Sequence, residues 1–195
     1  GTMKFSMIDQ TYSSSGSSGG GGSSSGGGGS RVTSGTTVSG STAASASTLP
    51  SYVVTGKWIQ NAAGKWLFTD NKRTYANEWA AVHNPYADTA KGQSAFDWFR
   101  FDQNGYMVTG WFTDAKDGNT YYLHASSDGT LGRMYTGWMW IDDNGDGIAE
   151  CYYFNPMSDG TRGKLYKSTK TPDGYQVNEK GQWIVNNVVQ TKLVK

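Results

Sequence analysis

Short runs of aromatic and β-branched residues recur along most of the chain, separated by polar segments rich in glycine. Two of these runs are Trp-Met-Trp-Ile at 138–141 and Cys-Tyr-Tyr-Phe at 151–154. Runs of this length and composition favour β-strands. Asp-Gly pairs at 128–129 and 159–160 are typical of turns. The pattern predicts successive antiparallel hairpins from residue 52 onward.

The hairpins belong to a repeat. Tyr121 and Tyr152 are 31 residues apart, and Gly110 and Gly137 are 27 apart. The four additional residues of the later unit fall in the segment Asp-Asp-Asn-Gly-Asp-Gly at 142–147. One hairpin cannot bury its own apolar face, whereas stacked hairpins bury a continuous one. We therefore expect an all-β solenoid of stacked antiparallel β-hairpin repeats.

One insertion interrupts the repeat at residues 82–97, between Trp79 and Trp98. Asn84-Pro85 breaks regular structure, and residues 87–96 predict a short helix. Helix is expected nowhere else between residues 52 and 183.

The first quarter of the chain has a different character. Residues 13–30 are all Gly or Ser, and no aromatic residue occurs in 13–51. Such a composition predicts a flexible linker without a packed core, followed by a repeat domain at 52–195. Residues 1–12 contain a short polar–apolar alternation. We interpret them as the remnant of an upstream domain of a larger protein, or as a tail.

Composition excludes several classes of protein. The net charge of +1 disfavours a basic nucleic-acid binder. No apolar run approaches the ~20 residues of a membrane span. The single cysteine excludes a disulfide framework within the chain and a multi-cysteine zinc site.

A recurring motif carries a resemblance to a known family. Between about residues 54 and 183, an aromatic strand, an Asn-Gly or Asp-Gly turn, a Met and a Thr-Gly-Trp follow one another in order. This order resembles the cell-wall-binding, or choline-binding, repeat of Gram-positive surface proteins. The resemblance implies a secreted, non-catalytic module that anchors a larger protein at the cell wall. Its ligand would be choline of teichoic acids, or a glycan, in aromatic pockets between successive hairpins.

The resemblance also implies how each pocket is built. A pocket takes the Trp after Gly of one hairpin, the Trp that opens its second strand, and a Tyr of the next hairpin, with a Met nearby. The most complete set here is Trp79, Trp98, Tyr122 and Met107. The full set of candidate ligand-binding residues is Trp79, Trp98, Met107, Trp111, Tyr122, Met134, Trp138 and Tyr153.

The sequence departs from the family pattern in three places. Thr120 and Cys151 replace the second Trp in the hairpins of Trp111 and Trp138. Arg100 stands in a Tyr position, where it would repel a cation from the preceding pocket. These departures support an alternative, a structural spacer with degenerate pockets.

Aromatic residues in a thin solenoid are also its core, since each buries about 150–250 Å² with or without a ligand. Alternation along the strands predicts that Tyr121, Tyr152 and Phe154 are core residues, on the face opposite Tyr122 and Tyr153.

Other candidate chemistry is limited. Asp142, Asn144 and Asp146 lie at alternate positions before Gly147, as in the first half of a calcium loop, and Glu150 could complete the ligands. A polar hairpin turn uses the same residue types. No other cofactor is expected.

Of the hypotheses for function, an enzyme has the least support in the sequence. The two histidines, His83 and His124, lie in different units, and Cys151 lies within a strand run, where an inert buried thiol is the ordinary case.

Overall fold

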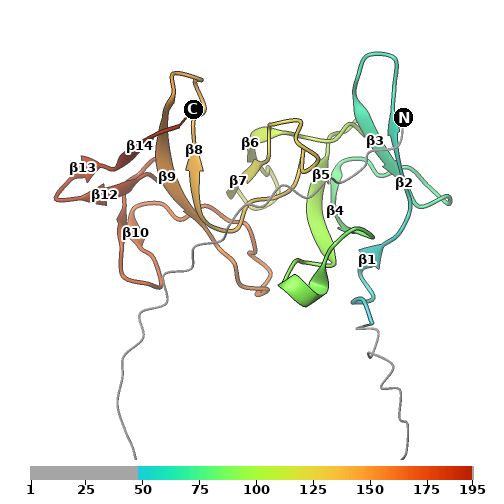
Figure 1. Cartoon of the computed structure of the whole chain (residues 1–195), viewed down its shortest axis with the longest axis horizontal. Helices are drawn as coiled ribbons and strands as arrows, with labels where there is room; N and C mark the ends of the chain where they lie inside the picture. Colours follow the sequence, from blue (N-terminus) through green and yellow to red (C-terminus); the bar gives the residue numbers. More distant parts are fainter. Residues whose placement is uncertain (1–47, 195) are drawn as a thin grey trace, which may run out of the picture. The chain divides into compact units, whose positions relative to one another are not determined.

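The computed structural model describes residues 48–194 (Figure 1). The predicted remnant at residues 1–12 and nearly all of the predicted linker at 13–51 lie outside the described residues.

The regular secondary structure of the described part is almost entirely β, as the hydrophobic pattern predicted. Four antiparallel hairpins follow one another in the chain, and each joins two strands that are consecutive in sequence (Figure 1). They are β2 (Lys57–Gln60) with β3 (Trp66–Thr69), β4 (Glu78–His83) with β5 (Phe96–Phe101), β6 (Gly110–Thr113) with β7 (Thr120–Leu123), and β8 (Gly137–Ile141) with β9 (Ile148–Phe154). The prediction of hairpin repeats is confirmed.

Short strands extend the hairpins at both ends of the described region. β1 (Val53–Val54) pairs with β4 in parallel, which the expectation of antiparallel hairpins did not include. Near the other end, β10 to β13 form an antiparallel four-stranded sheet, and β14 adds to the edge of β9. Their bounds are Thr169–Lys170, Gln176–Val177, Trp183–Val185, Val188–Val189 and, for β14, Thr191–Leu193.

The insertion at 82–97 lies at the end of hairpin β4–β5. Its outer residues continue the ladder as far as the pair of His83 and Phe96, and residues 84–95 form the loop. The expected helix at 87–96 is reduced to one 3-10 turn, η1 (Thr89–Lys91), which is the only helical segment in residues 48–194. Gly92, with φ of 78°, ends it after one turn by donating its N–H to the Thr89 carbonyl. No helix in this region is long and apolar enough to cross a membrane.

Backbone hydrogen bonds join each unit to the unit before it. The connector that follows a hairpin donates an N–H to a carbonyl in the second strand of the preceding hairpin. Three such bonds are Met107 N to Trp66 O (2.8 Å), Met134 N to Trp98 O (2.9 Å) and Leu165 N to Thr120 O (2.8 Å). The repeated bond fixes the register of successive hairpins.

Each of these connector side chains packs on a glycine of the next unit. A Cβ placed on Gly132 would lie 2.3 Å from Met107 Sδ, and one on Gly163 would lie 2.3 Å from Met134 Sδ. The same substitution at Gly181 would meet Leu165 at 2.8 Å. All three glycines have φ between 83° and 85°, a conformation that side chains with a Cβ rarely adopt. The units approach this closely only because glycine stands at these positions.

Aromatic residues form the core on both faces of the hairpins. Tyr121, Tyr152 and Phe154 are buried, as predicted. Tyr122 and Tyr153, on the opposite face, are also buried. Alternation therefore does not separate core from surface in these strands, because each face packs against a neighbouring unit or connector.

We predict that Gly163→Ala destabilises the protein more than Gly174→Ala. Both glycines have positive φ, 84° and 91°, so both substitutions strain the backbone. Only the Cβ at position 163 meets another residue, whereas the space around Gly174 is open. We expect an additional loss of about 1–3 kcal/mol in the free energy of unfolding, measured by urea denaturation. Equal losses for the two variants would contradict the packing role of Gly163.

Candidate functional site

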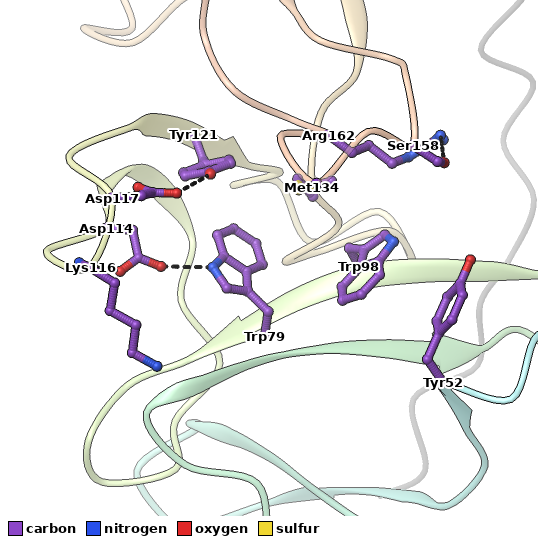
Figure 2. A pocket seen from close by; sticks show the side chains of 11 residues that line it. Tyr52, Trp79, Trp98, Asp114, Lys116, Asp117, Tyr121, Met134, Ser158 and Arg162 are labelled. Carbon is purple, nitrogen blue, oxygen red and sulfur yellow. Dashed lines mark hydrogen bonds between the residues drawn. The ribbon is translucent and has the colours of Figure 1, made fainter.

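A cavity of about 460 Å³ opens between hairpins β4–β5 and β6–β7 and the loop that follows β9 (Figure 2). This volume is within the range of small-molecule sites, about 300–1,000 Å³. The residues that line the cavity are Tyr52, Trp79, Trp98, Asp114, Lys116, Asp117, Tyr121, Met134, Ser158, Gly160 and Arg162.

Trp79 and Trp98 come from the two strands of one hairpin. Trp98 is directly opposite Ala81 in the ladder, and residues 79 and 81 share a face of β4. The two indoles are therefore diagonal neighbours on one face, and both are partly exposed. Tyr52 stacks on Trp98 with ring centroids 5.8 Å apart and an angle of 21° between the planes.

The next hairpin and its connector supply the other apolar walls. The Tyr121 ring lies 4.8 Å from the Trp79 ring, at an angle of 59°. Met134 packs in the same cluster, where its backbone bond to Trp98 and its contact with Gly163 hold it. Rings at steep angles to one another, with a thioether beside them, form an aromatic surface that can hold a cation over ring faces.

Two carboxylates orient the aromatic rings. Trp79 Nε1 donates to Asp114 Oδ2 at 2.9 Å, and the Tyr121 hydroxyl donates to Asp117 Oδ2 at 2.9 Å (Figure 2). Burial and the bond to Asp117 raise the pKa of Tyr121 to about 12. Desolvation alone would raise the pKa of Asp117, but hydrogen bonds from Asn119 and Tyr121 outweigh it, and the pKa is lowered. At neutral pH the phenol is therefore protonated and the Asp117 carboxylate is ionised.

Arg100 lies behind this wall, buried within the hairpin. Its guanidinium donates to Asn77 Oδ1 at 3.0 Å and to the Phe101 carbonyl. Its Nε is 4.0 Å from Asp114 Oδ2, and the group lies 5.0 Å from the centre of the Phe112 ring. The positive charge is therefore paired with Asp114, which itself holds Trp79.

The structure brings together only half of the most complete predicted set. Trp79 and Trp98 meet in the cavity, but Tyr122 and Met107 do not line it. Tyr121 and Met134 occupy the expected positions instead. The structure thus places Tyr122 and Met107 outside this cavity, and their role in ligand binding stays a prediction.

The physical reason is a shift of one residue in register. In three hairpins, the Trp of the first strand contacts the aromatic residue one position earlier in the next hairpin than we expected. The three ring pairs are Trp58 with Phe99 (4.8 Å), Trp79 with Tyr121 (4.8 Å) and Trp111 with Tyr152 (4.9 Å). Tyr122 and Tyr153 are instead the direct cross-strand partners of Trp111 and Trp138 within their own hairpins.

The other predicted residues lie in two further aromatic clusters. Trp111 packs between Tyr122 and Tyr152, at 4.9 Å from each ring. Trp138 contacts Tyr153, Tyr175 and Trp183 at 5.0, 5.8 and 6.0 Å. Ligand binding by Trp111, Trp138 and Tyr153, as by the residues of the cavity, stays a prediction.

Trp138 repeats one feature of the cavity. Its Nε1 donates to Asp173 Oδ2 at 2.8 Å, and the two residues are 35 positions apart, as are Trp79 and Asp114. In both cases the indole N–H of a first-strand Trp is bound by an acidic turn residue of a later hairpin. This spacing is a sequence signal from which Asp114 could have been found.

The acidic turn at 142–147 is held by its own hydrogen bonds. Asp142 accepts from the N–H groups of Gly145 and Gly147, and Asp146 accepts from the N–H of Ile148 and the amide of Asn144. No group of three His, Cys, Asp or Glu side chains that could hold a metal occurs in residues 48–194. The calcium site at Asp142, Asn144, Asp146 and Glu150 gains no geometric support and stays a prediction.

The residues weighed for catalysis have structural partners. His124 lies between the Tyr135 hydroxyl (2.6 Å) and Asp128 (2.8 Å), buried in the turn after β7. Burial raises the pKa of the Cys151 thiol to about 12, so the nucleophilic thiolate is scarce at neutral pH.

One carboxyl group that is largely buried, with 14% of its side chain exposed, lies next to the cavity wall. Asp97 precedes Trp98 in β5, and burial raises its pKa to about 6 although Arg133 and Arg162 oppose the shift. Arg133 Nε is 3.9 Å from Asp97 Oδ1.

The chain is similar to proteins of a known family. Residues 91–132 match the family model of the choline-binding repeat. No curated protein matches the chain. Among solved structures, the choline binding domain of Spr1274 from Streptococcus pneumoniae is 31% identical, over 48% of this chain and 90% of that one, with a TM-score of 0.34.

Two longer pneumococcal proteins are also similar. CbpJ of strain TIGR4 is 30% identical over 67% of this chain and 41% of its own, with a TM-score of 0.35. Choline binding protein F, solved in the presence of a peptidoglycan analogue, is 24% identical over 67% and 44%, with a TM-score of 0.35. The chain spans less than half the length of these two proteins.

We predict that Asp97→Asn stabilises the protein at pH 8 and has little effect at pH 4. A carboxyl whose pKa is raised on folding stabilises the folded state fully below about pH 3.8, and this contribution is lost as pH rises through about 6. The amide removes the cost of the buried charge, so the free energy of unfolding at pH 8 should rise by roughly 2–3 kcal/mol.

Urea denaturation at pH 4, 6 and 8 measures the effect. Asp143→Asn, at an exposed position, controls for the loss of one negative charge. A pH-independent difference between Asp97→Asn and wild type would contradict the assignment.

Proposed function

The chain belongs to the family of choline-binding repeat proteins, and we propose that it is a non-catalytic module whose cavity holds the quaternary ammonium group of choline. The observation that carries the proposal is the cavity wall made by Trp79, Trp98 and Tyr121. Aromatic faces attract a cation by about 0.5–2 kcal/mol per contact.

The carboxylates support this assignment. Trp79 and Tyr121 each donate a hydrogen bond to an aspartate, which fixes the rings and polarises them toward greater negative charge on their faces. A quaternary ammonium group has no N–H to donate, so ring faces and a thioether are suitable walls for it. Because a few contacts must offset the cost of association, we expect a dissociation constant of about a millimolar.

Such a module would bind the bacterial cell wall. We propose that teichoic-acid choline is the partner and that the module anchors a larger secreted protein at the cell surface. Weak single pockets gain avidity when a polymer presents many ligands.

A wall glycan is the second candidate ligand. It is favoured by the stack of Tyr52 on Trp98, 5.8 Å apart and nearly parallel, with Tyr52 half exposed. A flat, partly exposed aromatic platform of this kind suits the apolar face of a sugar ring.

We predict that Trp98→Ala weakens choline binding about tenfold, whereas Trp138→Ala changes it less than twofold. Trp98 is a cavity wall, and Trp138 lies in a different cluster beside Cys151. Choline titration followed by tryptophan fluorescence measures both, after circular dichroism has shown each variant to be folded.

Three outcomes distinguish a cation site, a glycan site and a purely structural aromatic core. Equal binding by folded Trp98→Ala and wild type would contradict the cation site. Retention on wall glycan without choline binding would favour the glycan reading. If wild type binds neither, the aromatic residues are core residues of a spacer.

We also predict that Tyr121→Leu and Tyr122→Leu have different effects. The two tyrosines are adjacent and equally buried, but only Tyr121 lines the cavity. Tyr121→Leu should weaken choline binding severalfold because one ring face is lost. Tyr122→Leu should lower the melting temperature with little change in affinity, since its ring packs on Trp111 and Tyr135. The reverse pattern would restore Tyr122 as the pocket residue.

A further inference from the structure

The first-strand tryptophan of each of the four hairpins faces one residue directly across the ladder. In three hairpins this residue is aromatic and its ring packs on the indole: Trp58 with Phe68 (5.1 Å), Trp111 with Tyr122 (4.9 Å) and Trp138 with Tyr153 (5.0 Å). In hairpin β4–β5 the residue opposite Trp79 is Arg100. A charged side chain therefore takes a position that an aromatic ring occupies in the other hairpins.

Arg100 is buried, with 5% of its surface exposed. Its guanidinium donates to Asn77 Oδ1 at 3.0 Å and to the Phe101 carbonyl, which are both neutral acceptors. Its Nε is also buried and has no hydrogen-bond partner among the described residues, but it lies 4.0 Å from Asp114 Oδ2. The charge of Arg100 is therefore balanced by an aspartate of the next hairpin.

Asp114 needs this positive charge. It is as buried as Arg100, and an ionised carboxylate in such a place is costly without a compensating charge. Within residues 48–194, no other Lys, Arg or His nitrogen lies within 4 Å of its carboxylate. The same Oδ2 accepts the Trp79 indole N–H at 2.9 Å. A guanidinium, a carboxylate and an indole are thus linked in series.

The other pair of a tryptophan and an aspartate has no such cation. Trp138 Nε1 donates to Asp173 Oδ2 at 2.8 Å, and the residue opposite Trp138 is Tyr153. Asp173 is exposed to solvent, and Thr171 donates to its other oxygen at 2.6 Å. Of these two hairpins, the arginine is therefore found in the one whose aspartate is buried.

The guanidinium also contacts the ring beside Trp79. It lies 5.0 Å from the centre of the Phe112 ring, within the range of a cation–π contact. That ring meets Trp79 edge to face, at 5.9 Å and 77°. Arg100 therefore interacts with two residues of the next hairpin, Phe112 and Asp114, and both of them contact Trp79.

We propose that Arg100 is a positioning residue of the cavity, which acts through Asp114 to hold the Trp79 indole in the cavity wall. This inference rests on the proposed function and adds to it a residue outside the cavity lining. Without the guanidinium, the buried carboxylate turns toward solvent or takes up a proton, and either change weakens the hydrogen bond that fixes Trp79.

Arg100→Gln in the full chain tests the proposal. A ¹⁵N-correlated NMR spectrum reports the indole N–H of Trp79, with that of Trp138 as an internal control. We expect the Trp79 proton signal to move upfield and its exchange with solvent to accelerate about tenfold, the size of one charge-assisted hydrogen bond, while the Trp138 signal stays in place. Choline affinity should fall about three- to fivefold.

The direction of the affinity change separates positioning from electrostatic repulsion. Losing a positive charge near the cavity would by itself strengthen the binding of a cation. Weaker binding by Arg100→Gln therefore supports the positioning role, whereas unchanged or tighter binding would overturn it. Arg100→Lys is the matched control, because it keeps the charge and should keep the Trp79 signal close to that of wild type.

A double variant shows whether Arg100 acts through Asp114. Arg100→Gln with Asp114→Asn removes both charges, and the amide oxygen at position 114 accepts the Trp79 N–H with no buried charge to balance. We expect this variant to recover the Trp79 signal and most of the lost affinity. A double variant as perturbed as Arg100→Gln alone would contradict the proposed coupling.

Folding and the proposed function are separated from this result. If Arg100→Gln does not fold, a folded double variant with the wild-type Trp79 signal supports the inference, and failure of both to fold would assign Arg100 to packing alone. Absence of choline binding by wild type would overturn the proposed function. A Trp79 signal that moves in Arg100→Gln and returns in the double variant would then still support Arg100 as the residue that positions the indole.

Discussion

The contact between a methionine or leucine of one unit and a glycine of the next is the constraint on which this structure depends. A hairpin with strands of four to seven residues cannot bury its aromatic face alone, so each unit must approach its neighbour closely. Met134 reaches Gly163 at a distance that excludes any Cβ, and its backbone N–H bonds to Trp98. The same contact places the Met134 side chain in the wall of the cavity. Folding and the candidate site therefore share one interaction.

Electrostatics then determines how the aromatic walls are held. Trp79 is fixed by Asp114, and Asp114 in turn is paired with the buried Arg100. A cation that seemed to oppose ligand binding in the sequence is thus the internal counter-ion of a carboxylate. Arg162 of the cavity wall comes from the loop after β9, two hairpins later in the chain than Trp79, and its charge opposes the upward shift of the Asp97 pKa.

Much of this architecture was predictable from local sequence. Aromatic runs and Asn-Gly or Asp-Gly turns are local signals, and they located the hairpins and the pair of Trp79 and Trp98. The choice between Tyr121 and Tyr122 was not predictable, because alternation identifies a face only when the other face is exposed, and both tyrosines are buried. The stagger between successive hairpins determines which of the two tyrosines faces the cavity. This stagger depends on hydrogen bonds between residues far apart in sequence, such as that of Leu165 N to Thr120 O. Asp117 and Arg162 resembled ordinary turn residues, since nothing in their neighbourhood in sequence shows that they share a cavity.

The most direct test of the account is the response of individual tryptophans to choline. The protein has eight, and each indole N–H gives its own signal in a ¹⁵N-correlated NMR spectrum. We predict that the signals of Trp79 and Trp98 shift saturably as choline is added, with one common dissociation constant, while that of the buried Trp58 stays in place. Unchanged signals for Trp79 and Trp98 at saturating choline, or shifts confined to other tryptophans, would contradict the account.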